Sequence, residues 1–272
     1  MEYGTDERKG KVSVRTLLKM KRNGEKISAL TAYDALFASF LDELMDIILV
    51  GDSLGMVMAG YETTIPVNMD QMILHTQYVR REVRHAMLVA DMPFMSYQIS
   101  PEEALRNAGR LFQEGGAEAV KLEGGRSVAE AVHRCVEAGI PVMGHLGLTP
   151  QSIHTFGGWQ TRAKNQDEAQ RLKEDAHILQ EAGIFSLVLE KVPATLAEDV
   201  TQSLDIPTIG IGAGPQTDGQ ILVTQDLLGM YEKMKPKFVR KYAELAGIIR
   251  EALKQYHQDV KSGAFPSEEE SF

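Results

Sequence analysis

The chain has 272 residues, of which 43% are hydrophobic and 25% are charged, and its formal net charge is −9. These proportions are ordinary for a globular protein, and the net acidity argues against a general affinity for nucleic acid. The sequence contains no apolar run of about 18 residues and no apolar stretch near its start, so it predicts neither a membrane span nor a secretory signal. The lone Cys135 excludes an internal disulfide and a multi-cysteine zinc site, and we expect a cytoplasmic protein.

Short apolar runs, each followed by a turn and a helical pattern, recur along the chain after a predicted N-terminal helix at 13–22. Residues 1–12 match no element, and we expect them to be flexible. Most runs lack strict alternation of apolar and polar residues, which is typical of parallel strands buried on both faces. The predicted strands are 27–31, 47–50, 87–90, 119–122, 141–145, 185–189, 208–211 and 221–223.

Helix signals separate these runs. Ser100 and Glu103 form a predicted capping box, with proline at the first helical position, and Ser127 with Glu130 forms a second. Cys135 lies in the apolar stripe of that second helix, which indicates a small buried side chain and not a nucleophile. Further helices are predicted at 167–182 and 239–262.

Strands that alternate with helices without a break indicate a parallel sheet with helices outside it. The repeat favours one (β/α)8 TIM barrel over residues 1–272, because that fold uses roughly 250 residues. In this barrel the helix at 13–22 caps the bottom, and the helix at 239–262 closes the ring. The alternative is a doubly wound open sheet, but the glycines at 210–214 follow the spacing G-x-G-x-G. A dinucleotide-binding loop needs G-x-G-x-x-G leading directly into a helix.

Polar side chains follow most of the predicted strands, at the end where a TIM barrel carries its functional residues. Adjacent strands lie roughly 4.8 Å apart, so carboxylates from three consecutive strands crowd one wall of the barrel mouth. Such crowding is unfavourable unless a cation or a proton relieves it, and oxygen ligands without a cysteine cluster predict Mg²⁺ before Zn²⁺. In chain order, the residues at the strand ends are Asp52 with Ser53, Asp91, Glu123, His145 and Glu190.

Lys121 adds a cation to this group. The period of two in a strand places Lys121 and Glu123 on the same face. A lysine that points into the barrel near its open end suits a charged ligand, although a buried Lys–Glu pair that ties strands together is the structural alternative. The presence of several acids and a lysine at consecutive strand ends favours a functional site.

The segment 51–55, Gly-Asp-Ser-Leu-Gly, matches the G-x-S-x-G turn of serine hydrolases. That turn requires a helix directly after it, whereas we expect a loop at 56–66. The same segment contains the Gly-Asp-Ser-Leu of another esterase group, which also needs an Asp-x-x-His pattern that the sequence lacks. We therefore reject a serine hydrolase.

Long ordered segments of this sequence, from about Lys19 to the C-terminus, resemble the ketopantoate (3-methyl-2-oxobutanoate) hydroxymethyltransferase family. The matching segments include Thr31-Ala-Tyr-Asp34, Val50-Gly-Asp-Ser-Leu-Gly-Met56, Ala90-Asp-Met-Pro-Phe94, Val120-Lys-Leu-Glu-Gly124, Gly144-His-Leu-Gly-Leu-Thr-Pro-Gln151, Leu187-Val-Leu-Glu190 and Ile206-Pro-Thr-Ile-Gly-Ile-Gly-Ala-Gly214.

The resemblance implies a cytoplasmic TIM barrel of the phosphoenolpyruvate/pyruvate superfamily, commonly a homodecamer in bacteria. It implies transfer of a one-carbon unit from 5,10-methylenetetrahydrofolate to 3-methyl-2-oxobutanoate, which gives 2-dehydropantoate and commits carbon to pantothenate biosynthesis. One Mg²⁺ per subunit is implied. By position, Asp52, Asp91 and Glu123 correspond to its ligands. The oxo-acid contacts correspond to Asp52, Ser53, Asp91 and Lys121, and the proton acceptor to Glu190; His145 is a possible additional site residue.

Two rival functions remain open at this point. Another metal-dependent oxo-acid lyase or mutase of the superfamily would often carry a catalytic cysteine in a barrel loop, whereas Cys135 lies in a predicted helix. A catalytically dead barrel that serves as a binding module is disfavoured because all of the implied site acids are present.

Overall fold

The structure is a computed structural model that describes residues 10–234 and 236–272, so most of the segment 1–12 lies outside the described residues. The chain divides into two compact units, Met1–Leu222 and Val223–Phe272. All of the strands that form the sheet lie in the first unit. The prediction that one domain comprises all 272 residues therefore stays a prediction.

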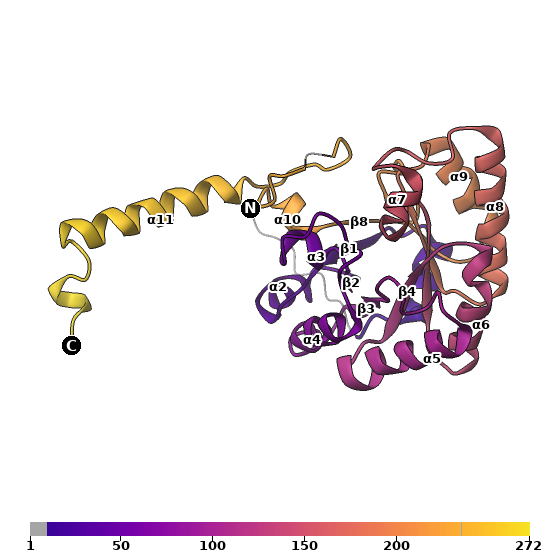
Figure 1. Cartoon of the computed structure of the whole chain (residues 1–272), viewed down its shortest axis with the longest axis horizontal. Helices are drawn as coiled ribbons and strands as arrows, with labels where there is room; N and C mark the ends of the chain where they lie inside the picture. The colour runs from indigo at the N-terminus through magenta and orange to yellow at the C-terminus, as the bar shows by residue number, and fades with distance from the viewer. Residues whose placement is uncertain (1–9, 235) are drawn as a thin grey trace. The chain divides into compact units, whose positions relative to one another are not determined.

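The strands of the first unit form a closed parallel barrel in which each pairs with its neighbours in the chain and β8 returns to β1 (Figure 1). This closure confirms the TIM barrel and contradicts the open-sheet alternative. The strands are β1 (Ile27–Thr31), β2 (Ile47–Val50), β3 (Met87–Asp91), β4 (Ala119–Glu123), β5 (Val142–Gly147), β6 (Ser186–Glu190), β7 (Thr208–Ile211) and β8 (Gly219–Leu222).

Strand boundaries differ from the predicted ones mainly at the ends that matter for function. β3, β4 and β6 each extend one residue further than predicted, because Asp91, Glu123 and Glu190 still pair with the neighbouring strand. β5 extends to Gly147, so His145 lies inside that strand and not at its end. Asp91, Glu123 and Glu190 are thus held by strand backbone, whereas Asp52 lies in the turn after β2.

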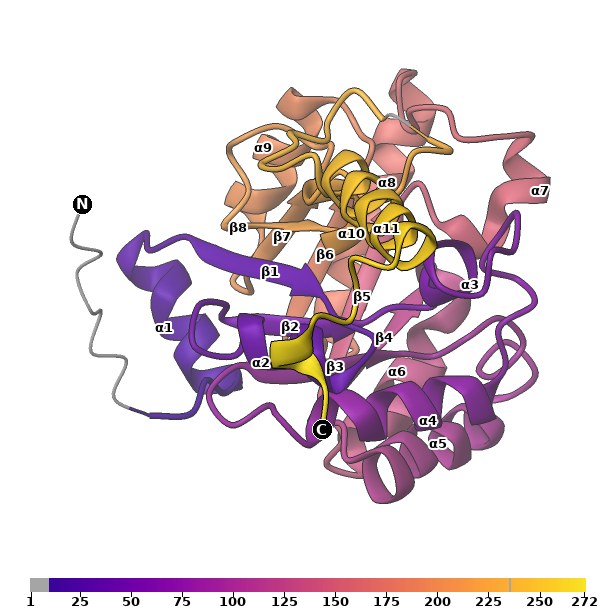
Figure 2. The same ribbon diagram turned by 90° about the vertical axis from the view of Figure 1, so that its left-hand side faces the viewer.

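Helices cover the outside of the barrel (Figure 2). The helices of the first unit are α1 (Val14–Asn23), α2 (Ala35–Leu41), α3 (Leu54–Val57), α4 (Met69–Arg80), α5 (Pro101–Arg110) with the π-turn η1 (Leu111–Gly115), the 3-10 turn η2 (Arg126–Val128), α6 (Ala129–Glu137), the 3-10 turn η3 (Pro150–Ser152), α7 (Ile153–Phe156), α8 (Gln166–Glu181) and α9 (Ala194–Ser203). None of the described helices is long and apolar enough to cross a membrane.

One predicted helix start is confirmed and another is wrong. The Ser100 side chain accepts a hydrogen bond from the Glu103 backbone N–H, with Pro101 as the first residue of α5. Ser127 caps no helix, because it lies inside η2, where the Val128 N–H donates to the Gly125 carbonyl. Helix α6 therefore begins later than predicted, after Val128.

The N-terminal helix α1 lies at the bottom of the barrel. Its Leu17 is fully buried in the apolar cluster that fills the barrel interior, with Ile27, Ile47 and Met87 among its members. Lys21 adds polar contacts between α1 and the barrel, because its ammonium donates to Asp218 Oδ2 and to the Thr201 carbonyl, both at 2.9 Å.

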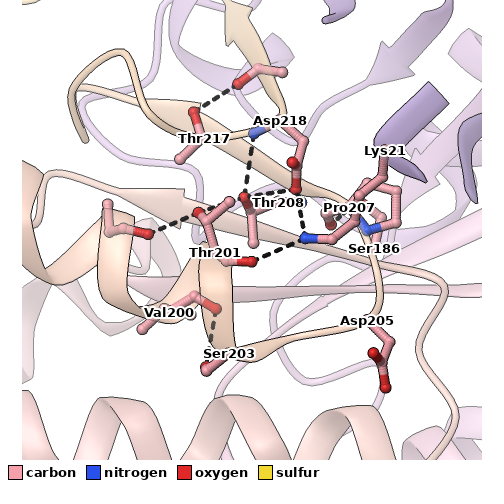
Figure 3. A network of polar contacts seen from close by, with 12 residues as sticks. Lys21, Ser186, Val200, Thr201, Ser203, Asp205, Pro207, Thr208, Thr217 and Asp218 are labelled. Atoms are coloured by element: carbon pink, nitrogen blue, oxygen red, sulfur yellow. Dashed lines mark hydrogen bonds and ion pairs between the residues drawn. The ribbon is translucent and has the colours of Figure 1, made fainter. Parts of the chain in front are cut away.

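Asp218 joins the last two strands at the same end (Figure 3). Its Oδ2 accepts hydrogen bonds from the Thr208 backbone N–H at 2.8 Å and from the Thr208 hydroxyl at 3.2 Å. Thr201 on α9 lies 2.7 Å from that hydroxyl. This polar network, made of Lys21, Thr201, Thr208 and Asp218, fastens the closing strands to α1 and α9 at the end of the barrel opposite the strand C-termini.

The second unit contains α10 (Thr224–Leu227), α11 (Leu245–Ser262) and the 3-10 turn η4 (Glu268–Glu270). The predicted helix at 239–262 begins at Leu245 instead. The backbone N–H groups of Tyr242, Leu245 and Ala246 donate to the carbonyls of residues 227–229, which fixes 239–244 as irregular chain. No residue of α11 is buried, and the expectation that this helix closes the barrel stays a prediction.

Candidate active site

Three acids converge at the C-terminal ends of β2, β3 and β4. Asp91 and Glu123 are the last residues of their strands, and Asp52 follows β2 by two positions. All three are buried, with exposed fractions of 3% for Asp52, 4% for Asp91 and 6% for Glu123. The Asp52 backbone N–H donates to Asp91 Oδ2 at 3.0 Å, which links the first two strand ends directly.

Lys121 supplies the positive charge among these acids. It lies opposite Asp91 in the register of β3 and β4, and its Nζ is 3.0 Å from Asp91 Oδ1. Burial opposes the charged form of this lysine, but attraction to Asp91, Glu123 and Asp52 outweighs burial and raises its pKa. Lys121 is therefore an ammonium at neutral pH, held among the three acids.

The acids respond to this environment in different ways. Burial, followed by repulsion from Asp91 and Glu123, raises the pKa of Asp52 well above its usual value. Burial also raises the pKa of Asp91, although Lys121 acts in the opposite direction. For Glu123, hydrogen bonding and attraction from His145 overcome the effect of burial and lower the pKa. The ionised form is thus favoured at Glu123 and disfavoured at Asp52 and Asp91.

His145 connects this cluster to Glu190. Its Nδ1 lies 3.2 Å from Lys121 Nζ and 3.4 Å from Glu123 Oε1, and its Nε2 lies 3.3 Å from Glu190 Oε2. Burial and Lys121 lower the pKa of His145, but the two glutamates outweigh them and raise it. Glu190 keeps 13% of its side chain exposed, so it lies at the open edge of the cluster.

The backbone between His145 and Glu190 is closely packed. Gly147, the last residue of β5, pairs with Glu190 and has a φ of +95°. A Cβ atom at this position would lie 2.2 Å from the Glu190 carbonyl oxygen, so only glycine fits.

Ser53, the remaining predicted site residue, also belongs to this end of the barrel. It directly precedes α3, so a short helix follows Ser53 and includes the first two residues of the segment 56–66, where a loop was predicted. The Ser53 Oγ lies 2.8 Å from the Tyr33 hydroxyl. The structure thus brings all of the predicted site residues to one region, and His145 proves to be in contact with three of them.

Two residues of the site were missed in the sequence. Both are buried: Gln151 donates to the carboxylates of Asp52 and Glu123, and the Tyr97 hydroxyl accepts from the Glu123 backbone N–H. Gln151 ends the matching segment that begins at Gly144, but no local pattern distinguishes it from a surface glutamine in a turn. Only its contacts across the barrel mouth reveal it.

The residues present suit a hard divalent ion by their chemistry. Among the described residues, no three His, Cys, Asp or Glu side chains are already spaced as the ligands of a metal ion. However, Asp52, Asp91 and Glu123 are buried carboxylates close enough to influence one another's pKa. Buried like charges of this kind favour a cation, and carboxylate oxygens are the ligands that Mg²⁺ prefers.

Comparison with known proteins identifies the family. The sequence profile of the ketopantoate hydroxymethyltransferase family matches residues 11–268. The chain belongs to this family. A relative from Syntrophus aciditrophicus, named 3-methyl-2-oxobutanoate hydroxymethyltransferase, is 57% identical over 269 residues, which cover 98% of this chain and 99% of the relative. A Caldicellulosiruptor saccharolyticus protein of the same name is 55% identical over 96% of this chain and 99% of its own length.

Solved structures of similar fold are more distant in sequence. Phosphonopyruvate hydrolase in complex with oxalate and Mg²⁺ superposes with a TM-score of 0.62 at 13% identity, covering 94% of this chain and 92% of that one. Oxaloacetate acetylhydrolase gives a TM-score of 0.58 at 13% identity, covering 96% of this chain and 100% of that one. At this identity the likeness shows the barrel fold alone. The family match confirms the resemblance seen in the sequence.

Proposed function

We propose that this enzyme transfers a hydroxymethyl group from 5,10-methylenetetrahydrofolate to 3-methyl-2-oxobutanoate, giving 2-dehydropantoate for pantothenate biosynthesis. The names of relatives that share 51–57% identity over nearly the whole chain support the substrate. The single observation that carries the chemistry is the cluster of three buried acids around Lys121 at the barrel mouth.

One Mg²⁺ per subunit is part of the proposal, with Asp52, Asp91 and Glu123 as the residues that would hold it. When bound, the ion supplies an electrophile for the carboxylate and keto oxygens of a 2-oxo acid and favours loss of the neighbouring proton. The crowding of the carboxylates supports this assignment, since a cation would relieve it.

The chain's own residues account for binding and proton transfer. The Lys121 ammonium neutralises negative charge on the oxo acid and on its developing oxyanion. Ser53 offers a hydroxyl to the substrate. Glu190 removes the C3 proton. His145, whose Nε2 lies 3.3 Å from Glu190 Oε2, orients that carboxylate and, as the imidazolium, balances part of its negative charge.

The rival from the same superfamily, an oxo-acid lyase or mutase with a loop cysteine, receives no support from Cys135. This thiol is buried on α6, where burial raises its pKa to about 11. A thiol so protonated is a poor acid or nucleophile.

A homodecamer in the cytoplasm completes the proposal. Self-association is supported by the large apolar side chains that α11 exposes, which include Ile248, Leu253 and Tyr256. Apolar surface of this kind on a helix without buried residues is typical of protein interfaces.

A turnover assay with product detection tests the proposed reaction. Enzyme with both substrates and Mg²⁺ should form 2-dehydropantoate, whereas omission of the folate should abolish the product. Dialysis against EDTA should stop turnover and Mg²⁺ should restore it. Asp91→Asn should lower activity by roughly two orders of magnitude or more, about 3 kcal/mol in the barrier. Full activity of the EDTA-treated enzyme would rule out the metal, and oxo-acid cleavage without folate would favour the lyase.

A further inference from the structure

Gln151 lies at the centre of the hydrogen bonds that join the three acid-bearing strand ends. It belongs to η3, just after β5, and only 6% of its surface is exposed. Its side-chain Nε2 donates to Asp52 Oδ2 and to the Met92 carbonyl, both at 2.9 Å. Its backbone N–H donates to Glu123 Oε2 at 3.0 Å. One residue therefore binds an oxygen of two different acids.

Tyr97 determines which way the Gln151 amide points. The Tyr97 hydroxyl donates to Gln151 Oε1 at 2.7 Å and accepts from the Glu123 backbone N–H at 3.1 Å. Gln98 Nε2 also lies 3.2 Å from Gln151 Oε1. With Oε1 committed to these donors, the two N–H bonds of the amide must face Asp52 and Met92. The reversed amide would place Oε1 against two other acceptors.

A neutral donor is well suited to this place. Asp52 and Glu123 come from strands that are not adjacent, and two buried carboxylates bonded to one residue repel each other. A lysine or arginine here would hold the acids together but would compete with a bound cation. An amide holds them without adding charge.

We propose that Gln151 is a positioning residue for the metal site, which fixes one oxygen of Asp52 and one of Glu123, with Tyr97 fixing Gln151 in turn. The inference rests on the proposed function, because it assumes that these acids bind a divalent ion. Residues that orient metal ligands typically contribute a factor of about 10–100 in metal affinity. Loss of Gln151 should therefore weaken metal binding without removing any ligand.

Binding of Mn²⁺ alone, followed by the electron paramagnetic resonance signal of the free ion, tests this role without an activity assay. The full-length parent, Gln151→Met and Tyr97→Phe are titrated in the absence of substrate, and thermal melting is recorded for each. Gln151→Met keeps the side-chain length but removes the amide, and its dissociation constant for Mn²⁺ should rise by about 10–100-fold. Tyr97→Phe removes one hydroxyl and should raise it by a smaller factor.

Thr201→Val is the matched control. Thr201 is likewise buried and hydrogen-bonded, but it belongs to the network at the bottom of the barrel (Figure 3). This variant should lower the melting temperature and leave the Mn²⁺ affinity at the parent value.

The Mn²⁺ titrations distinguish failure of the positioning role from failure of the metal site itself. Gln151→Met and Tyr97→Phe that bind Mn²⁺ as tightly as the parent, with only lower melting temperatures, would reduce Gln151 to a structural residue and overturn the inference alone. A parent enzyme that binds no Mn²⁺ would overturn the metal site and the inference together. If Gln151→Met does not fold, Tyr97→Phe decides the matter by the same comparison.

Discussion

At the scale of single residues, the proposed base Glu190 and the proposed charge-bearing Lys121 differ in exposure. Lys121 is buried among acids that hold it as a cation, whereas Glu190 retains 13% exposure and one close polar neighbour in His145. A group that must exchange a proton with substrate needs such access, and a group that must only carry charge does not. The two roles that we propose therefore suit the places of Lys121 on β4 and Glu190 on β6.

Replacement of Glu190 by glutamine tests whether its carboxylate removes the substrate proton. In D₂O the parent enzyme with Mg²⁺ should exchange the C3 hydrogen of 3-methyl-2-oxobutanoate without any folate. Proton NMR would show the methine signal disappear and the methyl doublet collapse. Glu190→Gln keeps the shape of the side chain but accepts no proton, so exchange should slow by about 10²–10⁴-fold. A folded Glu190→Gln enzyme that exchanges at the parent rate would remove Glu190 from the mechanism.

Among the elements, strands were easier to predict from the sequence than the contacts between them. Apolar runs located every strand because a strand buried on both faces needs a continuous apolar segment. The acids at 52, 91 and 123 followed from the strand ends. Gln151 could not be found in this way, because its partners Asp52 and Met92 are 99 and 59 positions away. Ser127 was misread for a related reason. Its local pattern fits a helix cap, but the 3-10 turn η2 incorporates it.

Helix α6 should protect its cysteine from reagents. Cys135 is fully buried and burial raises its pKa to about 11, so only about one thiol in 10³ is ionised at pH 8. Iodoacetamide should label the native enzyme far more slowly than a free thiol, with a rate that still rises with pH above 9. In guanidinium chloride one thiol per chain should react promptly. Rapid labelling of the native enzyme would contradict the buried position.

Helix α1 should contribute stability without affecting catalysis. Lys21→Met removes the bonds to Asp218 Oδ2 and the Thr201 carbonyl, although Asp218 keeps its bonds to Thr208. Loss of hydrogen bonds to a charged group should lower the free energy of unfolding by about 1.5–3 kcal/mol. Denaturant melts would measure this loss. The kcat and KM of the folded variant should match the parent, since the network lies at the other end of the barrel, and a changed kcat would show coupling between the two ends.

For the molecule as a whole, the barrel separates stability from chemistry. Apolar side chains and the Lys21 network fill the lower part, whereas charged groups gather at the strand C-termini. This division is general in TIM barrels, and it explains why the fold could be predicted before the details of the site. The second unit differs in its packing, because α11 buries none of its residues within one chain.

Light scattering of the purified protein should detect self-association. We expect a mass several times 30.1 kDa, with ten subunits as the leading value, because closed symmetric assemblies are the default for soluble oligomers. Leu253→Glu places a charge among the exposed apolar residues of α11 and should shift the mass downward, whereas exposed Glu251→Gln on the same helix should leave it unchanged. A monomer at micromolar concentration would refute the oligomer.

The contact between Gly147 and Glu190 bears on how mutations in this enzyme should be read. A missense allele at position 147 leaves the identity of every acid, of the lysine and of the histidine unchanged. However, the Cβ of any added side chain would lie 2.2 Å from the Glu190 carbonyl oxygen, so β5 or β6 must be displaced. Because His145 lies on one of these strands and Glu190 on the other, the displacement separates the pair. We expect such an allele to behave as a loss of function although none of the proposed site residues has changed. Gly109, beside which a Cβ would meet nothing within 4 Å, can vary freely by comparison.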